Sequence, residues 1–148
     1  MRRPTSYCAL ALVVGVTATA YAQHAEQVVK LPEDVVFKAP LNPGGPPGAV
    51  LYGDPKKEGL YVNRVKFPQG FKVTPHYHPD ERTVVVLSGT WYVGVGEQWD
   101  ETKMKGYPPG SFVSKPAKMP HYTWAKDGEV IIQITGIGPN ASTPIPQK

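Results

Sequence analysis

Glycine and proline divide this chain into short segments, and this division limits its fold more than any other feature. The 148 residues include 15 glycines and 17 prolines, and the apolar stretches between them are short. No stretch carries a long helical period. Short strands about ten residues apart, separated by Gly- and Pro-rich turns, are typical of a β sandwich or barrel. The sequence therefore predicts an all-β fold in a single domain.

The apolar stretches place a central barrel between two less regular segments. Residues 42–48, Asn-Pro-Gly-Gly-Pro-Pro-Gly, favour neither a helix nor an interior strand and are expected to form a loop. We assign 23–48 to N-terminal strands and this loop, 49–138 to the barrel, and 139–148 to a C-terminal tail that is loose at its end. The strands predicted within the barrel are 49–52, 60–67, 83–87, 90–96, 111–115, 121–125 and 129–135.

The first 22 residues have the pattern of a signal peptide. Arg2 and Arg3 precede a largely apolar, uncharged stretch, and Ala20-Tyr-Ala22 fits a cleavage site before Gln23. A membrane anchor is the alternative, but the apolar stretch is shorter than the ~20 residues that a span needs. We therefore expect an exported protein, periplasmic or secreted, with no membrane span in its mature form.

Cleavage would also change the composition. It would remove Cys8, the single cysteine of the chain, so the mature form would have no disulfide. The net charge would fall from +4 to +2, because 16 − 2 = 14 basic residues would then face 12 acidic ones. The remaining lysines are scattered rather than clustered, so we expect no nucleic-acid partner.

Three histidines are the candidate metal ligands. His76 and His78 are one residue apart on an extended segment, so their side chains point to the same face of a sheet. His121 lies in a comparable setting further along the chain. Three imidazoles favour one divalent transition metal (zinc, copper, nickel or iron, with manganese also open) over magnesium or calcium. The alternative is a hydrogen-bonded barrel mouth without metal.

The chain resembles the cupin superfamily, whose small barrels carry two sequence motifs. The matching positions of the first motif, G-x5-H-x-H-x3,4-E-x6-G, are Gly70, His76, His78 and Gly89. The matching positions of the second, G-x5-P-x-G-x2-H-x3-N, are Gly110, Pro116 and His121. The resemblance covers residues 70–125 and implies a double-stranded β-helix (jelly-roll) barrel with a metal inside one end, commonly in a dimer.

The chain departs from these motifs at several positions. Arg82 stands where the first motif has its glutamate, and Glu81 comes one residue early. Strand alternation turns residue 82 inward with the histidines and residue 81 outward, so Glu81 is a ligand only if a bulge shifts the phase. Lys118 replaces a turn glycine of the second motif and Ala125 its asparagine, both at positions peripheral to the ion.

Arg82 has two possible roles. A guanidinium cannot ligate a cation, so an inward Arg82 calls for an anion between it and the metal, such as a substrate carboxylate, enolate or phosphate. Alternatively, Arg82 swings to the rim and pairs with Asp80 or Glu81. The first role makes Arg82 a substrate-binding residue.

The run Val84-Val85-Val86-Leu87 is apolar on both faces of its predicted strand. A strand with one face in solvent would alternate, so the outer face is expected to be covered as well. An N-terminal strand or a second subunit would cover it, and we expect a homodimer.

Together these features predict an exported metal-binding cupin that acts on a small anionic or enolisable substrate. Dioxygenase chemistry and isomerase or lyase chemistry both remain open, and no catalytic residue is assigned. The alternative is a non-catalytic barrel that binds a small molecule or the metal itself. The fold alone does not decide, since similar barrels support many reactions.

Overall fold

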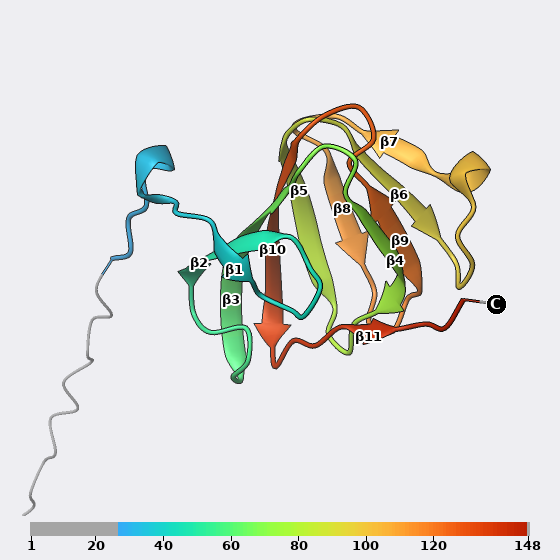
Figure 1. The fold of residues 1–148 in the computed structure, drawn as a ribbon. Helices are drawn as coiled ribbons and strands as arrows, with labels where there is room; N and C mark the ends of the chain where they lie inside the picture. The colour runs from blue at the N-terminus through green and yellow to red at the C-terminus, as the bar shows by residue number, and fades with distance from the viewer. Residues whose placement is uncertain (1–26, 148) are drawn as a thin grey trace, which may run out of the picture.

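The structure, a computed structural model, describes residues 27–147, so the expected signal peptide lies outside the described residues. Two β-sheets pack face to face around the core (Figure 1). The six-stranded sheet has the order β1-β2-β3-β10-β5-β8 and the five-stranded sheet the order β11-β4-β9-β6-β7. This all-β sandwich is the architecture that the spacing of glycine and proline predicts.

The strands are short and mostly match the predicted segments. In chain order they are β1 (Lys38–Pro40), β2 (Pro47–Tyr52), β3 (Gly59–Phe67), β4 (Lys72–Tyr77), β5 (Arg82–Ser88), β6 (Trp91–Val95), β7 (Lys105–Tyr107), β8 (Phe112–Lys115), β9 (His121–Trp124), β10 (Val130–Gly138) and β11 (Thr143–Pro144). Two 3-10 turns, η1 (Pro32–Asp34) and η2 (Glu101–Lys103), complete the described elements. Asp100 caps η2, its side chain accepting the Thr102 N–H.

Alternating side chains build the core between the sheets. In β3 the residues from Tyr61 to Phe67 alternate between buried and partly exposed, because successive side chains point to opposite faces. Val84 and Val86 of β5 and Ile132 of β10 enter the same core. The strands β10 and β3 pair over their whole length, so β10 is a central strand of the larger sheet.

The N-terminal strands do not cover the outer face of β5, although the sequence offered this as one of two possibilities. β1 and β2 instead extend the sheet by pairing beside β3. The outward residues of β5 therefore stay partly exposed, with Leu87 39% exposed. The expectation of a covering N-terminal strand was wrong. The N-terminal strands form backbone hydrogen bonds at the edge of the sheet and do not pack on its outer face.

The C-terminal tail differs from the loose segment that its composition indicated. Residues of β11 pair with β4, Thr143 opposite Tyr77 and Pro144 opposite His76. Gln147 is hydrogen-bonded to the backbone of Glu97 and of Trp99. The tail thus runs beside the histidine strand, where Figure 1 shows it crossing below β4.

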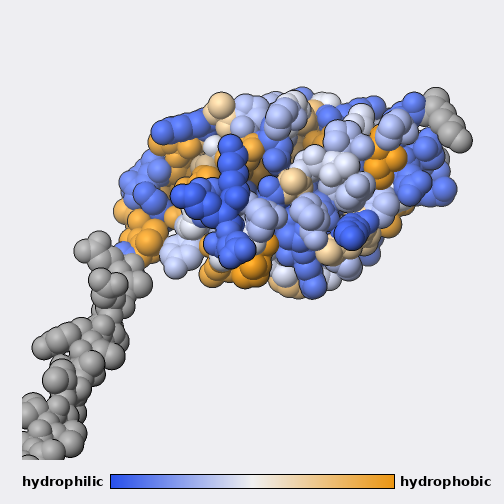
Figure 2. All heavy atoms as spheres, turned by 90° about the horizontal axis from the view of Figure 1, so that it is seen from below, coloured by the Kyte–Doolittle hydropathy of each residue, from blue (hydrophilic) through white to orange (hydrophobic). Residues whose placement is uncertain are grey.

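The described surface is mixed in character. The face seen in Figure 2 is largely hydrophilic, with separate hydrophobic patches between polar residues. No helix among residues 27–147 is long and apolar enough to cross a membrane.

Candidate metal centre

Three imidazoles meet at one end of the barrel interior. His76 lies in β4, His78 follows directly after this strand, and His121 begins β9. His76 and His121 are register partners in neighbouring antiparallel strands, which brings their side chains together. One ligand nitrogen from each histidine lies within 4.8 Å of the others.

A backbone carbonyl fixes the orientation of each imidazole. The Nδ1 atoms lie 2.8 Å from Thr74 O for His76, 2.6 Å from Ala141 O for His78, and 3.0 Å from Met119 O for His121. A carbonyl oxygen only accepts, so each Nδ1 is the donor. In a neutral imidazole this leaves Nε2 with its lone pair free, which is the arrangement that metal-binding histidines usually show.

The surroundings keep these imidazoles neutral. Burial lowers the pKa of His76 to about 4 and, together with the nearby Arg82 charge, that of His78 to about 3. The pKa of His121 is also lowered, first by burial and then by Lys115. A lowered pKa means that Nε2 stays unprotonated near neutral pH.

The donor set fits a transition-metal ion. Three neutral, buried or partly buried imidazoles with free Nε2 atoms are ligands that zinc, copper, nickel and iron accept. The cluster contains no carboxylate: Glu81, the possible fourth ligand, is exposed and lies outside it. Alternation along the start of β5 accounts for this, because Arg82 takes the inward position.

Arg82 points inward, as the first alternative has it, and pairs with Asp80, as the second has it. Its side chain is 4% exposed and therefore inside the barrel, yet it pairs with Asp80, whose side chain is 6% exposed. Arg82 Nη2 also donates to Asn140 Oδ1 at 2.7 Å, and Tyr61 donates its hydroxyl to Asp80 at 2.8 Å. Burial raises the pKa of Tyr61, and so does its bond to Asp80, which keeps the hydroxyl protonated as a donor. Arg82 is thus largely neutralised by the protein itself.

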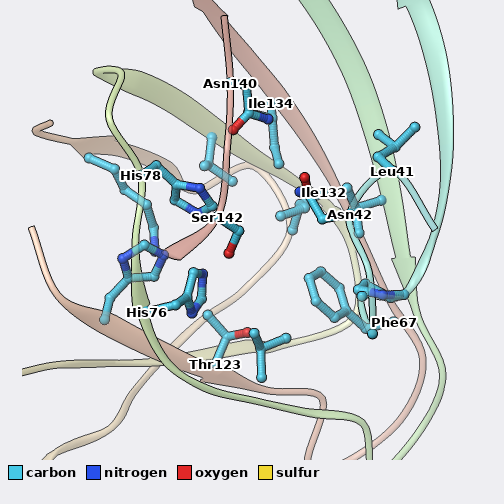
Figure 3. Close-up of a pocket in the computed structure, with 18 of the residues that line it drawn as sticks. Leu41, Asn42, Phe67, His76, His78, Thr123, Ile132, Ile134, Asn140 and Ser142 are labelled. Atoms are coloured by element: carbon cyan, nitrogen blue, oxygen red, sulfur yellow. The ribbon is translucent and has the colours of Figure 1, made fainter. Parts of the chain in front are cut away.

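The histidines open onto a cavity of about 440 Å³ between the two sheets. Figure 3 shows His76, His78, Ser142 and Thr123 towards one side of it, and Phe67 and Leu41 on the opposite side. The loop that contains Leu41 and Asn42 comes from the N-terminal segment, and Ser142 comes from the tail. None of the lining residues in the described part of the chain is acidic.

Several polar residues of the site were not anticipated. Asn140, Ala141 and Ser142 lie in the tail, where a Pro-, Ser- and Thr-rich composition gives no sign of a role. The position of Lys115 could have been predicted from strand alternation, which places it on the same face of β8 as Val113. A lysine on the apolar face of a strand is unusual and marks a candidate site residue.

One turn near the site follows the family pattern despite its substitution. Lys118, at the position of the motif glycine, has a φ of 61°, the left-handed conformation that glycine adopts most easily. Its N–H donates to His78 O at 2.7 Å. The turn therefore keeps its shape and helps to hold the histidine segment in place.

Comparison with known proteins gives a domain match and a fold. A family model described as "Cupin domain" matches residues 63–134. No curated protein matches the chain. The polyketide cyclase RemF from Streptomyces resistomycificus is similar in structure, with a TM-score of 0.69 and 15% identity over 83% of this chain and 88% of the other.

Two further structures are similar at lower scores. The DMSP lyase DddQ from Ruegeria pomeroyi has a TM-score of 0.55 and 22% identity over 66% of this chain and 50% of the lyase. A cupin 2 conserved barrel domain protein from Rhodopseudomonas palustris has a TM-score of 0.56 and 16% identity over 73% of each chain. At these identities the likeness shows the fold, and the two-sheet sandwich described above agrees with it.

Proposed function

Because the chain carries a cupin domain over residues 63–134, we propose that it binds one divalent transition metal through His76, His78 and His121 and acts on a small anionic or enolisable molecule in the adjoining cavity. The observation that carries the proposal is the set of three Nδ1–carbonyl bonds, which leave the three Nε2 lone pairs free, on histidines that each place one ring nitrogen within 4.8 Å of the others. When bound, the metal would supply Lewis-acid or oxygen chemistry.

The protein's own residues favour an anionic ligand. The cavity is lined by three basic residues, Lys72, Arg82 and Lys115, and by no acidic one among the described residues. Glu101 pairs with Lys72 and the buried Asp80 with Arg82, which leaves Lys115 without an acidic partner in the described part of the chain. The resulting positive surroundings, away from bulk water, favour a carboxylate, enolate or similar group over a neutral one.

Two reaction types remain open, dioxygenase chemistry and isomerase or lyase chemistry. The structural neighbours include proteins named as a cyclase and as lyases, but similar barrels support unrelated reactions, so the likeness does not choose between them.

A non-catalytic binding barrel is the second candidate function. It is favoured by the absence of an acidic residue among those that line the cavity in the part of the chain described here. A proton-transfer enzyme needs a positioned base, and the three imidazoles are occupied if they hold the metal. Turnover of any substrate by the metal-loaded protein would argue against this candidate.

The metal content of the purified protein tests the proposal. We expect about one zinc, copper, nickel, iron or manganese ion per chain by elemental analysis, when no metal-binding affinity tag is used. His76→Ala should lose the ion, whereas Arg64→Met on the outer face of the sheet should keep it. A protein without metal, which also takes up none on soaking, would defeat the metal proposal.

We further propose that the protein is exported and works as a homodimer. Export rests on the charged start and apolar stretch of residues 1–22. The dimer rests on the exposed apolar residues of the outer sheet face, which include Phe112 at 67% and Ile137 at 60%. N-terminal sequencing of protein recovered from the periplasm or medium checks the first: a start at Gln23 is expected, and an intact Met1 contradicts it.

A further inference from the structure

Lys115 is a buried cation to which no described residue supplies a counter-charge. Its side chain lies inside the barrel, 3% exposed, opposite Arg82 in the register of β8 and β5. Arg82 is paired with Asp80, but the Lys115 ammonium makes neither a hydrogen bond nor an ion pair with any residue in 27–147. Its described polar contact is with the Trp91 ring, whose centroid lies 4.7 Å from Nζ.

Burial of a lysine without a partner lowers the stability of the ligand-free protein. Burial lowers its pKa well below the usual range, and the neighbouring Arg82 charge lowers it further. Buried charges are normally paired, and a contact with an aromatic face only partly replaces the lost water. A group of this kind therefore calls for a partner that the chain itself does not provide.

Several neighbouring buried polar atoms also lack a hydrogen-bond partner within the described chain. Arg82 Nε, Trp91 Nε1 and Lys115 Nζ are buried donors without an acceptor, and the three residues line one cavity. Two further buried oxygens, of Asn63 and Thr123, also lack partners there. Donors predominate in this set, so the missing partner is rich in acceptor atoms.

The side of the cavity away from the histidines is largely apolar, although Asn42 also lines it, and this side limits what else the ligand can be. Val65, Phe67, Val84, Ile132 and Ile134 line the cavity together with Leu41 from the loop. Figure 3 shows Phe67 and Leu41 on the side away from His76 and His78. The volume of about 440 Å³ suits a small organic molecule rather than an inorganic anion alone.

We infer that Lys115 is the anchor for the acidic group of the ligand, and that the ligand class is a small carboxylic acid with an aryl or branched apolar body. The carboxylate would accept from Lys115 Nζ and the free Arg82 Nε, and the apolar body would fill the side lined by Phe67 and Leu41. The inference rests on the proposed function in placing the ligand in the same cavity, but it does not need the metal. It also makes Lys115 the charged anchor, while Arg82, which Asp80 already neutralises, contributes only its Nε–H as a second donor.

Calorimetric titration of the metal-free protein tests this anchor. The probes are cinnamate, its uncharged analogue cinnamamide, and acetate, which lacks the apolar body. We expect cinnamate to bind roughly 10- to 100-fold more tightly than cinnamamide, because bonds to charged groups are stronger. Acetate should bind more weakly than cinnamate.

Lys115→Met, of similar length and without the charge, should remove this preference. Its affinity for cinnamate should fall to that for cinnamamide, and its affinity for the amide should stay within about twofold. Lys115→Gln serves as a second variant if the first folds poorly. Lys126→Met is the matched control, since Lys126 also lies over aromatic rings (Trp124 and Tyr92) but is exposed.

Thermal unfolding separates an anchor from a structural lysine. Without ligand, Lys115→Met should melt roughly 2–6 °C higher than the natural protein, because a buried amine without a hydrogen-bond partner, whose charged form burial disfavours, is replaced by an apolar side chain. A lower melting temperature with unchanged cinnamate binding would overturn the inference. Equal binding of cinnamate and cinnamamide to the natural protein, or binding of neither, would also overturn it.

Elemental analysis of the same samples distinguishes the two proposals. If Lys115→Met takes up metal but the carboxylate preference is absent from the natural protein, the anchor fails and the metal site stands. If the natural protein holds no metal but binds cinnamate through Lys115, the metal proposal fails and the anchor stands.

Discussion

At the scale of single residues, the carbonyls behind the imidazoles matter as much as the imidazoles. Thr74 and Met119 lie two residues before His76 and His121 on the same segments, so these two histidines are oriented locally. His78 instead depends on Ala141, 63 residues away in the chain. Two ligands are thus held by their own strands, and the third is held by a distant segment.

The Arg82–Asp80 pair leads to a first prediction. Arg82→Met should destabilise the protein by about 3–5 kcal/mol, because it leaves the Asp80 carboxylate buried beside Tyr61 without its counter-ion. Urea unfolding measures the change. Arg64→Met, which removes an outward arginine bonded to Gln133, should cost less than about 1 kcal/mol.

A double variant completes this test. Arg82→Met with Asp80→Asn should be more stable than the sum of the two single changes predicts, since neither charge then remains unpaired. Additive effects would show that the pair is not coupled. An Arg82→Glu variant, designed from the family motif to supply a carboxylate ligand, would instead place a second carboxylate beside Asp80.

At the scale of elements, the tail β11 is part of the site although it looks like an irregular end. It pairs with β4 and brings Asn140 and Ala141 to Arg82 and His78. Figure 1 shows it crossing below β4, the strand that carries His76. The candidate metal site is therefore assembled from β4, β9 and a segment that joins them from outside the motif region.

Removal of the tail gives the second prediction. A chain ending at Gly138 should bind metal roughly 10- to 100-fold more weakly, because His78 loses the carbonyl that fixes its tautomer and orientation. Competition with a chromogenic chelator measures the affinity. A chain ending at Ile145 keeps Ala141 and β11 and should retain full affinity; equal affinity of both shortened chains and the natural one would contradict the role of the tail.

The elements also show what sequence patterns can and cannot predict here. Residues 60–67 alternate in the sequence and in the structure, so the inward position of Tyr61, Val65 and Phe67 was predictable. The same alternation placed Arg82 inside. The partner of Arg82 was harder to predict, because the sequence does not distinguish an Arg82–Asp80 ion pair buried in the barrel from one exposed at its rim. The role of 139–148 was not predictable, since its contacts are long-range and its composition is that of a loose end.

At the scale of the whole molecule, one sheet face remains open. Val85 of β5 lies opposite Phe112 of β8 in the ladder, on the side turned away from the core. Phe112 is 67% exposed and Leu87 39% exposed. An apolar surface of this kind is typical of a subunit contact, and a second copy of the chain is the partner that we propose for it.

The oligomeric state gives the third prediction. Sedimentation velocity at micromolar concentration should show a dimer, and Phe112→Asp should give a monomer that still binds metal, since Phe112 does not line the cavity. Val95→Asp is the control, because Val95 is also 60% exposed but lies on the other sheet. A monomeric natural protein, or a dimer that survives Phe112→Asp, would contradict the proposed contact.

The position of the last strands also sets the order of events during synthesis. β10 lies between β3 and β5, and Ala141 follows it, so neither the larger sheet nor the bond that orients His78 can form until residues 130–141 have left the ribosome. Such long-range pairing delays folding until the chain is nearly complete. A growing chain therefore lacks the complete histidine cluster, and under the proposed function its metal would be the one available wherever the completed chain folds.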